Sequence, residues 1–156
     1  MFFITLWKPL GDKMRIYLSQ KESTDSSLIS ISNISTFNDS VLDAEAKLII
    51  ADSFLSSFTI NEVKQVINLI VKKMRIGSEL IIIEQDLDLL SMKYFRDEIS
   101  LDYFNTLLFQ SPSRSIKNIL TGEFIREAIS SSSLKIEEQN FDENLCTYTI
   151  KVRRSS

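Results

Sequence analysis

The stretch 46-AKLIIADSFLSSFTINEVKQVINLIVKKMRIGSELIIIEQDLD-88 decides the fold of this chain. An apolar run at residues 48–51 ends at Asp52 and is followed by a loop of small residues. A helical pattern occupies residues 60–74, and a turn at 75–78 leads into a second apolar run at 80–83. Two buried strands separated by one amphipathic helix are typical of a βαβ unit, in which the strands run parallel. The stretch therefore predicts an α/β fold built on a parallel sheet.

The helix of this unit has its own start signal in the sequence. Thr59 and Glu62 have the spacing of a capping box, in which each side chain accepts from the backbone N–H of the other residue. Apolar side chains then recur at helical spacing. They are Ile60, Val63, Val66, Ile67, Ile70, Val71 and Met74. Such a wide apolar stripe predicts a crossover helix that lies on the sheet.

The rest of the chain supplies shorter elements. The patterns predict strands at 15–18 and 28–34, a mixed loop at 38–46 with one helical turn at 41–45, two short helices within 87–108, a loop at 109–118, a helix from residue 121, and strands at 134–139 and 146–152. The last two strands are joined by a short polar link, which favours an antiparallel hairpin. No repeat or linker interrupts this order. We therefore expect a single domain over residues 1–156, with residues 1–13 as an N-terminal arm.

Composition excludes several classes of function. A length of 156 residues with 44% hydrophobic and 25% charged residues is typical of one globular domain. The net charge of −3 gives no basic footprint, so we expect no nucleic-acid patch. No apolar run approaches the ~20 residues that a membrane helix needs, so we expect no membrane segment. Cys146 is the only cysteine, which rules out an intrachain disulfide and fits a cytoplasmic protein.

The chain contains no histidine, and this absence limits the chemistry further. It excludes a histidine general base, a Ser-His-Asp triad and a histidine-ligated metal. Glu84, Asp86 and Asp88 alternate after the second apolar run; we interpret them as acids at a helix start rather than metal ligands. We therefore expect neither a catalytic residue nor a metal site. The aromatic residues 94, 103, 104 and 109 are interpreted as core residues, and Cys146 as a small buried hydrophobe.

From Asp52 onward the sequence resembles the class I S-adenosylmethionine-dependent methyltransferases, in particular a small branch with a shortened first helix. The segment 50-IADSFLSS-57 stands where family members have a strand followed by a "VLEH"-like turn. The segment 74-MRIGS-78 stands on the family's "LKPGG" turn and retains Gly77. The acids of 84-EQD-86 end the next strand, and 121-TGEFIREAI-129 is similar to the helix before the closing hairpin. The resemblance implies a Rossmann-like class I methyltransferase fold, mostly parallel, with a C-terminal antiparallel hairpin.

The departures from the family pattern fall on the side that binds the cofactor. After the first strand the family has a glycine-rich loop, but here 15-RIYL-18 is followed by 19-SQKE-22 without a glycine. The second strand of the family ends in an acid that binds the ribose, whereas this chain has Asn33 in that region. The "EH" pair of the family turn has become Ser56-Ser57. Core features are kept and ligand features are lost.

We therefore expect a degenerate methyltransferase-like protein that is catalytically silent, binds no cofactor and works as a binding or structural subunit. It would act with a protein partner or as a homo-oligomer, with Phe2, Phe3 and Trp7 as contact candidates. The alternative is an active, divergent methyltransferase that holds S-adenosylmethionine with Ser19, Asn33 and Asp52. A third hypothesis is a binding domain for a different nucleotide or nucleotide-sugar.

Overall fold

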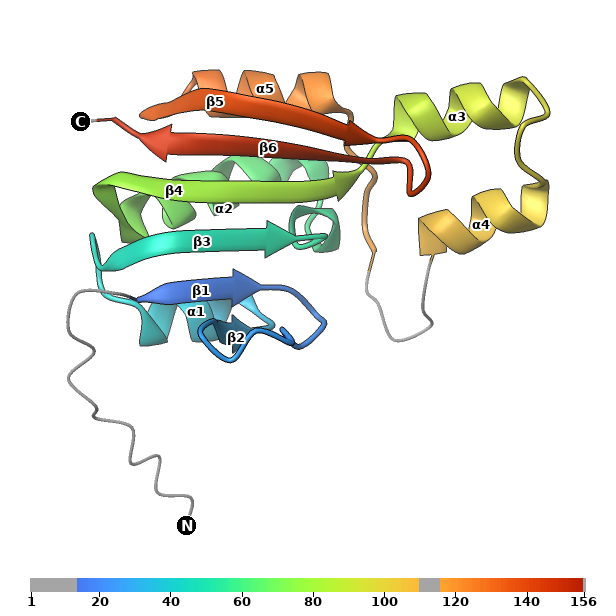
Figure 1. The fold of residues 1–156 in the computed structure, drawn as a ribbon. Coiled ribbons are helices and arrows are strands. Elements are labelled where there is room, and N and C mark those ends of the chain that lie inside the picture. Colours follow the sequence, from blue (N-terminus) through green and yellow to red (C-terminus); the bar gives the residue numbers. More distant parts are fainter. Residues whose placement is uncertain (1–13, 110–115, 156) are drawn as a thin grey trace, which may run out of the picture.

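The computed structural model describes residues 14–109 and 116–155, and it contains a sheet in the order β2-β1-β3-β4-β6-β5 (Figure 1). Strands β1 to β4 run parallel, and β6 runs antiparallel to both of its neighbours. The strands are β1 (Arg15–Leu18), β2 (Ile29–Ile31), β3 (Ala46–Asp52), β4 (Met74–Gln85), β5 (Leu134–Asp142) and β6 (Thr147–Arg154). The expected α/β fold, mostly parallel with a C-terminal antiparallel hairpin, is confirmed.

Helices cover one face of this sheet. The helices are α1 (Ile34–Ser40), α2 (Ile60–Lys73), α3 (Leu87–Phe95), α4 (Leu101–Phe109) and α5 (Gly122–Ser130), with a short 3-10 turn η1 (Leu55–Ser57). Helices α1, α2 and α5 lie behind the sheet in Figure 1, and α3 and α4 lie beyond the end of β4. Among the described residues, no helix is long and apolar enough to cross a membrane.

The α2 helix begins as its sequence predicts. The backbone N–H of Thr59 donates to the Glu62 carboxylate at 2.8 Å, which is one half of the capping box. The apolar stripe of α2, including Ile67 and Ile70, is buried against the sheet. Together with Ile49 and similar side chains of the strands, it forms the main core. Because this burial removes apolar area from both layers, it is the main source of stability for the βαβ unit.

A second, smaller core forms under α3 and α4. Its buried members are Leu90, Leu107, Leu108 and Cys146, so the expected burial of the cysteine is confirmed. The expectation for the aromatic residues was mostly wrong. Tyr94, Tyr103 and Phe109 are exposed, and only Phe104 packs against this cluster. Two short helices have too little facing surface to bury all four rings.

The segment after β2 differs from its prediction. The patterns predicted a strand at 28–34 and a loop at 38–46 with one helical turn at 41–45. Instead, β2 ends at Ile31 and α1 spans Ile34–Ser40, so the helix precedes the predicted turn. The reason is local: the Asn33 side chain accepts from the backbone N–H of Thr36 at 2.8 Å and so caps the helix. Burial of Phe37 then anchors the helix to the core.

The predicted turn at 75–78 lies inside the span of β4 rather than before it. Met74 pairs with Ala46 and Glu79 pairs with Leu48, so four residues of β4 loop out between these two pairs. Within this excursion Gly77 has φ = +82°, which places it in the left-handed region. The backbone conformation therefore favours glycine at this position.

Replacing Gly77 with alanine is expected to lower the free energy of unfolding by about 1 kcal/mol, because a side chain disfavours positive φ. No atom lies within 4 Å of the added Cβ, so the cost is conformational and involves no clash. Urea unfolding measures the change. The matched control is Gly122→Ala at the start of α5, where the new Cβ would lie 3.4 Å from Arg126. An equal loss in both variants would contradict this explanation.

Candidate functional site

A ligand crevice in an open α/β sheet lies at the carboxyl ends of the strands, where the strand order reverses. In this sheet the chain moves from β1 to β2 on one side and continues with β3 on the other, so the switch point lies between β1 and β3. Ser19 follows β1, Asn33 follows β2 and Asp52 ends β3. The fold therefore brings the three predicted site residues to one edge, which we call the carboxyl edge.

Ser19 is buried, and its polar groups already have partners. Its backbone N–H donates to the carbonyl of Ile31 at 3.1 Å, and its hydroxyl accepts from the backbone N–H of Lys21 at 3.2 Å. The first of these bonds ties the end of β1 to β2, and the second holds the loop that follows β1. A glycine-rich loop instead leaves its amides free to approach a ligand.

Asn33 is committed to the helix cap described above. Its side-chain oxygen accepts from Thr36, so one of its two lone pairs is already used. It also carries no charge, and a neutral acceptor binds a hydroxyl more weakly than a carboxylate does.

Asp52 forms a side-chain hydrogen bond that crosses the switch point between β1 and β3. The hydroxyl of Tyr17 on β1 donates to Asp52 Oδ2 at 2.6 Å, and the hydroxyl of Ser53 donates to Oδ1 at 3.2 Å. The 2.6 Å distance is typical of a charge-assisted bond. Tyr17 pairs in register with Ile50, so its side chain lies on the same sheet face as Asp52. Sequence reasoning missed Tyr17, because only the strand register shows which side chain reaches Asp52.

The loop after Asp52 is held by β4. Ser53 adopts φ = 50°, an uncommon conformation for a residue with a side chain, and its N–H donates to the carbonyl of Ile83 at 2.7 Å. The buried carboxylate of Glu84 accepts from the backbone N–H groups of Leu55 at 2.8 Å and Ser56 at 3.3 Å. Glu84 therefore has a structural role as the anchor of the η1 turn.

The interpretation of the alternating acids as helix-start residues is confirmed at Asp86. Its side chain caps α3 by accepting from the backbone N–H of Leu89 at 3.1 Å. Within residues 14–109 and 116–155, no cluster of three or more cysteines and acids is placed to hold a metal ion.

Two other titratable side chains lie near this edge, and neither is activated. Burial raises the pKa of the Tyr148 phenol, and the negative charges of Glu84 and Asp86 raise it further. Burial also raises the pKa of the Cys146 thiol. Both groups are therefore protonated at neutral pH. They supply neither a general base nor a thiolate nucleophile.

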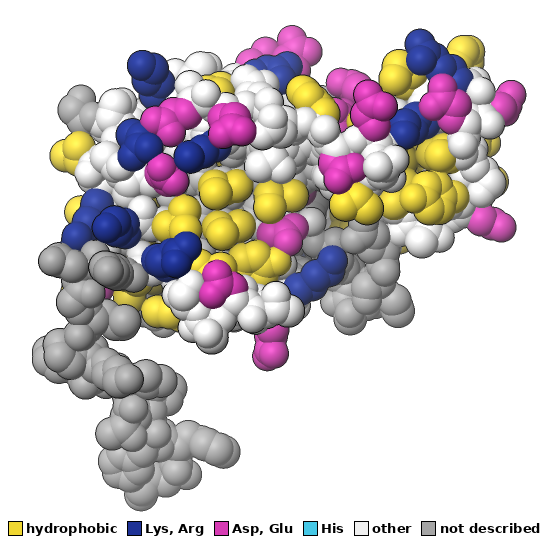
Figure 2. Space-filling view, in the orientation of Figure 1, with side chains coloured by type: hydrophobic (Ala, Val, Ile, Leu, Met, Phe, Trp, Pro, Cys, Tyr) yellow, Lys and Arg dark blue, Asp and Glu magenta, His cyan; other side chains and the backbone are white. Residues whose placement is uncertain are grey.

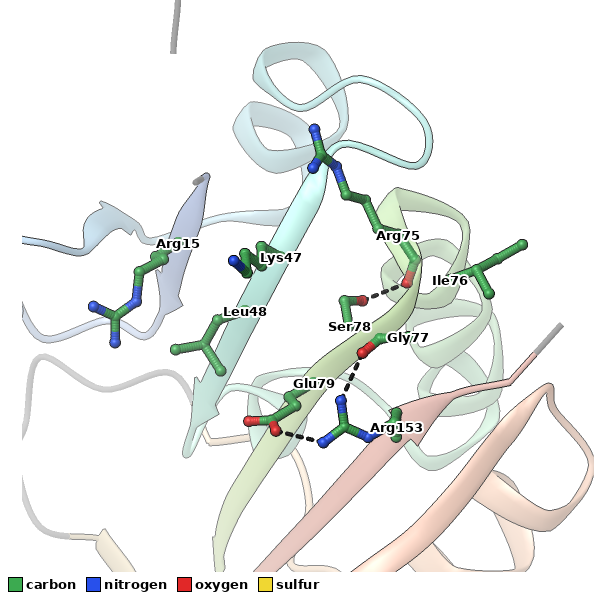
Figure 3. Close-up of a pocket in the computed structure, with 9 residues that line it drawn as sticks. All are labelled: Arg15, Lys47, Leu48, Arg75, Ile76, Gly77, Ser78, Glu79 and Arg153. Carbon is green, nitrogen blue, oxygen red and sulfur yellow. Dashed lines mark hydrogen bonds and ion pairs between the residues drawn. The ribbon is translucent and has the colours of Figure 1, made fainter. Parts of the chain in front are cut away.

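A cavity of about 540 Å³ lies at the opposite end of the strands, which we call the amino edge (Figure 3). It is lined by Arg15, Lys47, Leu48, Arg75, Ile76, Gly77, Ser78, Glu79 and Arg153. Arg153 donates to Glu79 and to the Gly77 carbonyl, each at 2.7 Å. None of the three predicted site residues lines this cavity, so it is separate from the crevice that the topology favours.

Two basic residues near the end of β6, Lys151 and Arg153, are paired with acids. Arg153 bridges Glu79 and Glu137, and Lys151 lies 3.5 Å from Glu79. The hydrogen bond from Arg153 lowers the pKa of the Glu137 carboxyl. The C-terminal cations therefore link neighbouring strands.

No protein-family model and no curated protein matches this chain. Solved methyltransferase structures do match its fold, with sequence identities of 10–12%. Magnesium protoporphyrin IX methyltransferase from Synechocystis PCC 6803, with bound SAH, aligns at a TM-score of 0.54 and 11% identity, over 82% of this chain and 51% of that one. A SAM-dependent methyltransferase from Methanosarcina mazei aligns at 0.54 and 10%, over 87% and 70%. An O-methyltransferase family protein from Burkholderia thailandensis aligns at 0.56 and 12%, over 83% and 36%.

The chain thus has a methyltransferase-like fold, and it spans about half the length of the Synechocystis enzyme. The resemblance drawn from the sequence is confirmed at the level of the fold.

Tyr17→Phe is expected to lower the free energy of unfolding by about 1.5–3 kcal/mol, because it removes a hydrogen bond to a carboxylate. The variant keeps the aromatic ring of residue 17, so the change in stability reports the contribution of the hydroxyl alone. Chemical denaturation followed by circular dichroism measures the change. The control is Tyr103→Phe, since Tyr103 is exposed on α4. If Tyr17→Phe matches the wild type in stability, the bond to Asp52 contributes nothing.

Proposed function

We propose that this protein is a degenerate, catalytically silent methyltransferase-like protein that serves as a binding or structural subunit. The observation that carries the proposal is the hydrogen bond between Tyr17 and Asp52 across the switch point. This bond engages one carboxylate oxygen of Asp52 at the end of β3. It also connects β1 and β3, the two strands between which a cofactor would lie.

The neighbouring positions support the same conclusion. The amide of Ser19 is bonded to β2, and the side-chain oxygen of Asn33 caps α1. A cofactor would have to replace these bonds with bonds of its own. Breaking the Tyr17–Asp52 bond alone costs about 1.5–3 kcal/mol. Such a cost lowers affinity by about one to two orders of magnitude.

An active, divergent methyltransferase is the second candidate. Methyl transfer depends largely on the positioning of two substrates, so the lack of an activated base does not exclude it. Ser53 provides the favourable observation, because strained backbone at a strand end is common at functional sites. In that case S-adenosylmethionine would be the cofactor, and Ser19, Asn33 and Asp52 would contact it.

The proposed role as a subunit needs a contact surface. Phe2, Phe3 and Trp7 lie outside the described residues. In the described part, Phe95 at the end of α3 is 88% exposed, and α3 and α4 carry other exposed apolar side chains. We propose this surface as the contact between copies or with a partner protein, within a single-domain cytoplasmic protein.

Isothermal titration calorimetry with S-adenosylmethionine and S-adenosylhomocysteine tests the silent state. We expect no heat of binding at micromolar protein concentration. ATP serves as a comparison ligand, because its binding alone would favour a domain for a different nucleotide. Tyr17→Phe is titrated in parallel to show whether the bond to Asp52 keeps a residual site closed. Micromolar binding of either methyl-donor ligand to the wild type would contradict the proposal.

Light scattering at micromolar concentration tests the subunit role. We expect a mass above that of the 18.0 kDa chain, either alone or with a partner added. Phe95→Ser should shift the mass toward the monomer, because it removes the most exposed ring from the contact. Leu42→Ser is the matched control, since Leu42 is 70% exposed but lies between α1 and β3. A monomer that captures no partner would count against a subunit.

A further inference from the structure

One face of the sheet carries no helix in the described part of the chain, and we call it the open face. Figure 1 shows α1, α2 and α5 together on the opposite side. The strand register places Tyr17, Ile50 and Ile81 side by side on the open face. Leu48 and Ile83 extend this row along the strands, and Figure 2 shows an apolar patch over the centre of the face. The side chains of the patch are half-buried.

The handedness of the crossovers explains why this face is open. The connection from β3 to β4 through α2 lies on the covered face. The step from β1 to β2 goes toward one edge of the sheet, whereas the step from β3 to β4 goes toward the other edge. A right-handed connection between β1 and β2 must therefore pass over the open face. That connection, residues 19–28, contains no helix. Because the connection between β1 and β2 has no helix, it does not cover the centre of the open face.

The strand sequences nevertheless require a cover on both sides. Parallel strands of apolar residues occur almost only where both faces are buried. In β3, Ile49 is fully buried on the covered face while the adjacent Ile50 points to the open face, and Ile82 and Ile81 repeat this arrangement in β4. Soluble proteins rarely leave such a patch in water unless it contacts another segment or molecule.

We propose that residues 2–7, with the sequence FFITLW, pack on the open face and bury this patch. Five of these six residues are large and apolar. The segment 110–115, QSPSRS, also lies outside the described residues. It is polar and has no large apolar side chain that could cover the patch. Composition thus singles out the N-terminal segment.

The point of attachment allows this placement. The described chain begins at Met14, directly before β1 and at the amino edge of the sheet. A chain of 13 residues reaches at most about 45 Å when extended. The seven residues of β3 span about 23 Å, so the segment can run the length of the face.

The hollow at the amino edge borders this path. Arg15, Leu48, Glu79 and Arg153 form one row across the open face, and all four line the cavity of about 540 Å³. Arg15 begins β1, directly after the first described residue, so the cavity lies beside the point at which the described chain starts (Figure 3).

A tethered segment has an advantage over a second copy of the chain. A short flexible tether gives an effective concentration in the millimolar range, well above micromolar protein. A second copy would have to displace the segment before it could reach the patch. The occupant is therefore the chain's own N-terminus, and this inference is independent of the proposed function.

Fluorescence of the full chain tests the inference directly, because Trp7 is the only tryptophan. If residues 2–7 pack on the open face, Trp7 emits at shorter wavelength than in the urea-unfolded chain and is protected from acrylamide. Both properties should be unchanged on dilution from micromolar to nanomolar concentration. Emission like that of the unfolded chain would overturn the proposal. Protection that is lost on dilution would also overturn it, in favour of a second copy.

Two variants locate the contact. Ile81→Asp places a charge in the middle of the open face and should shift the emission of Trp7 to longer wavelength, with a several-fold rise in acrylamide quenching. Leu101→Asp is the matched control, since Leu101 is exposed on α4, away from this face, and should leave the emission unchanged. If Ile81→Asp loses its circular dichroism signal, Leu48→Ser replaces it. Protected emission in a folded open-face variant would overturn the placement.

Discussion

Burial of β3 and β4 beneath α2 is the constraint on which the rest of the structure depends. The two central strands pair in parallel, and α2 packs its apolar stripe on one side of them. A parallel pair needs a crossover, and the crossover must be right-handed, so the position of α2 follows from the pairing. The neighbours β1 and β6 then add to the edges of this unit. Each of them contributes buried side chains to the same core.

The same constraint sets the carboxyl edge, where a ligand would lie. Because β1 and β3 are neighbours, Tyr17 and Asp52 meet across the switch point. Because β4 lies beside β3, Glu84 reaches the turn that follows Asp52. The polar groups at this edge therefore stabilise the loops of the fold. A methyltransferase-like scaffold does not by itself supply a methyltransferase site.

Sequence reasoning succeeded where the signal was local and long. The capping box at Thr59 and the stripe that follows it predicted α2 within a residue. It failed where a single side chain outweighed the periodic pattern, as at Asn33, whose cap converted the end of an expected strand into α1. It also failed for three of the four aromatic residues of α3 and α4, because helical spacing does not tell how much surface a neighbouring element offers.

The sequence by itself determined the βαβ unit, the order of the later elements and the lack of glycine in the loop after β1, because these depend on residue types at fixed spacing. It also placed Ser19, Asn33 and Asp52 at strand ends. Only the tertiary structure decided which partners those side chains have, because hydrogen bonds such as Tyr17 to Asp52 join residues that are 35 positions apart and depend on strand register. It also decided that one sheet face lacks a helix, because the side on which a crossover lies depends on the order of the strands.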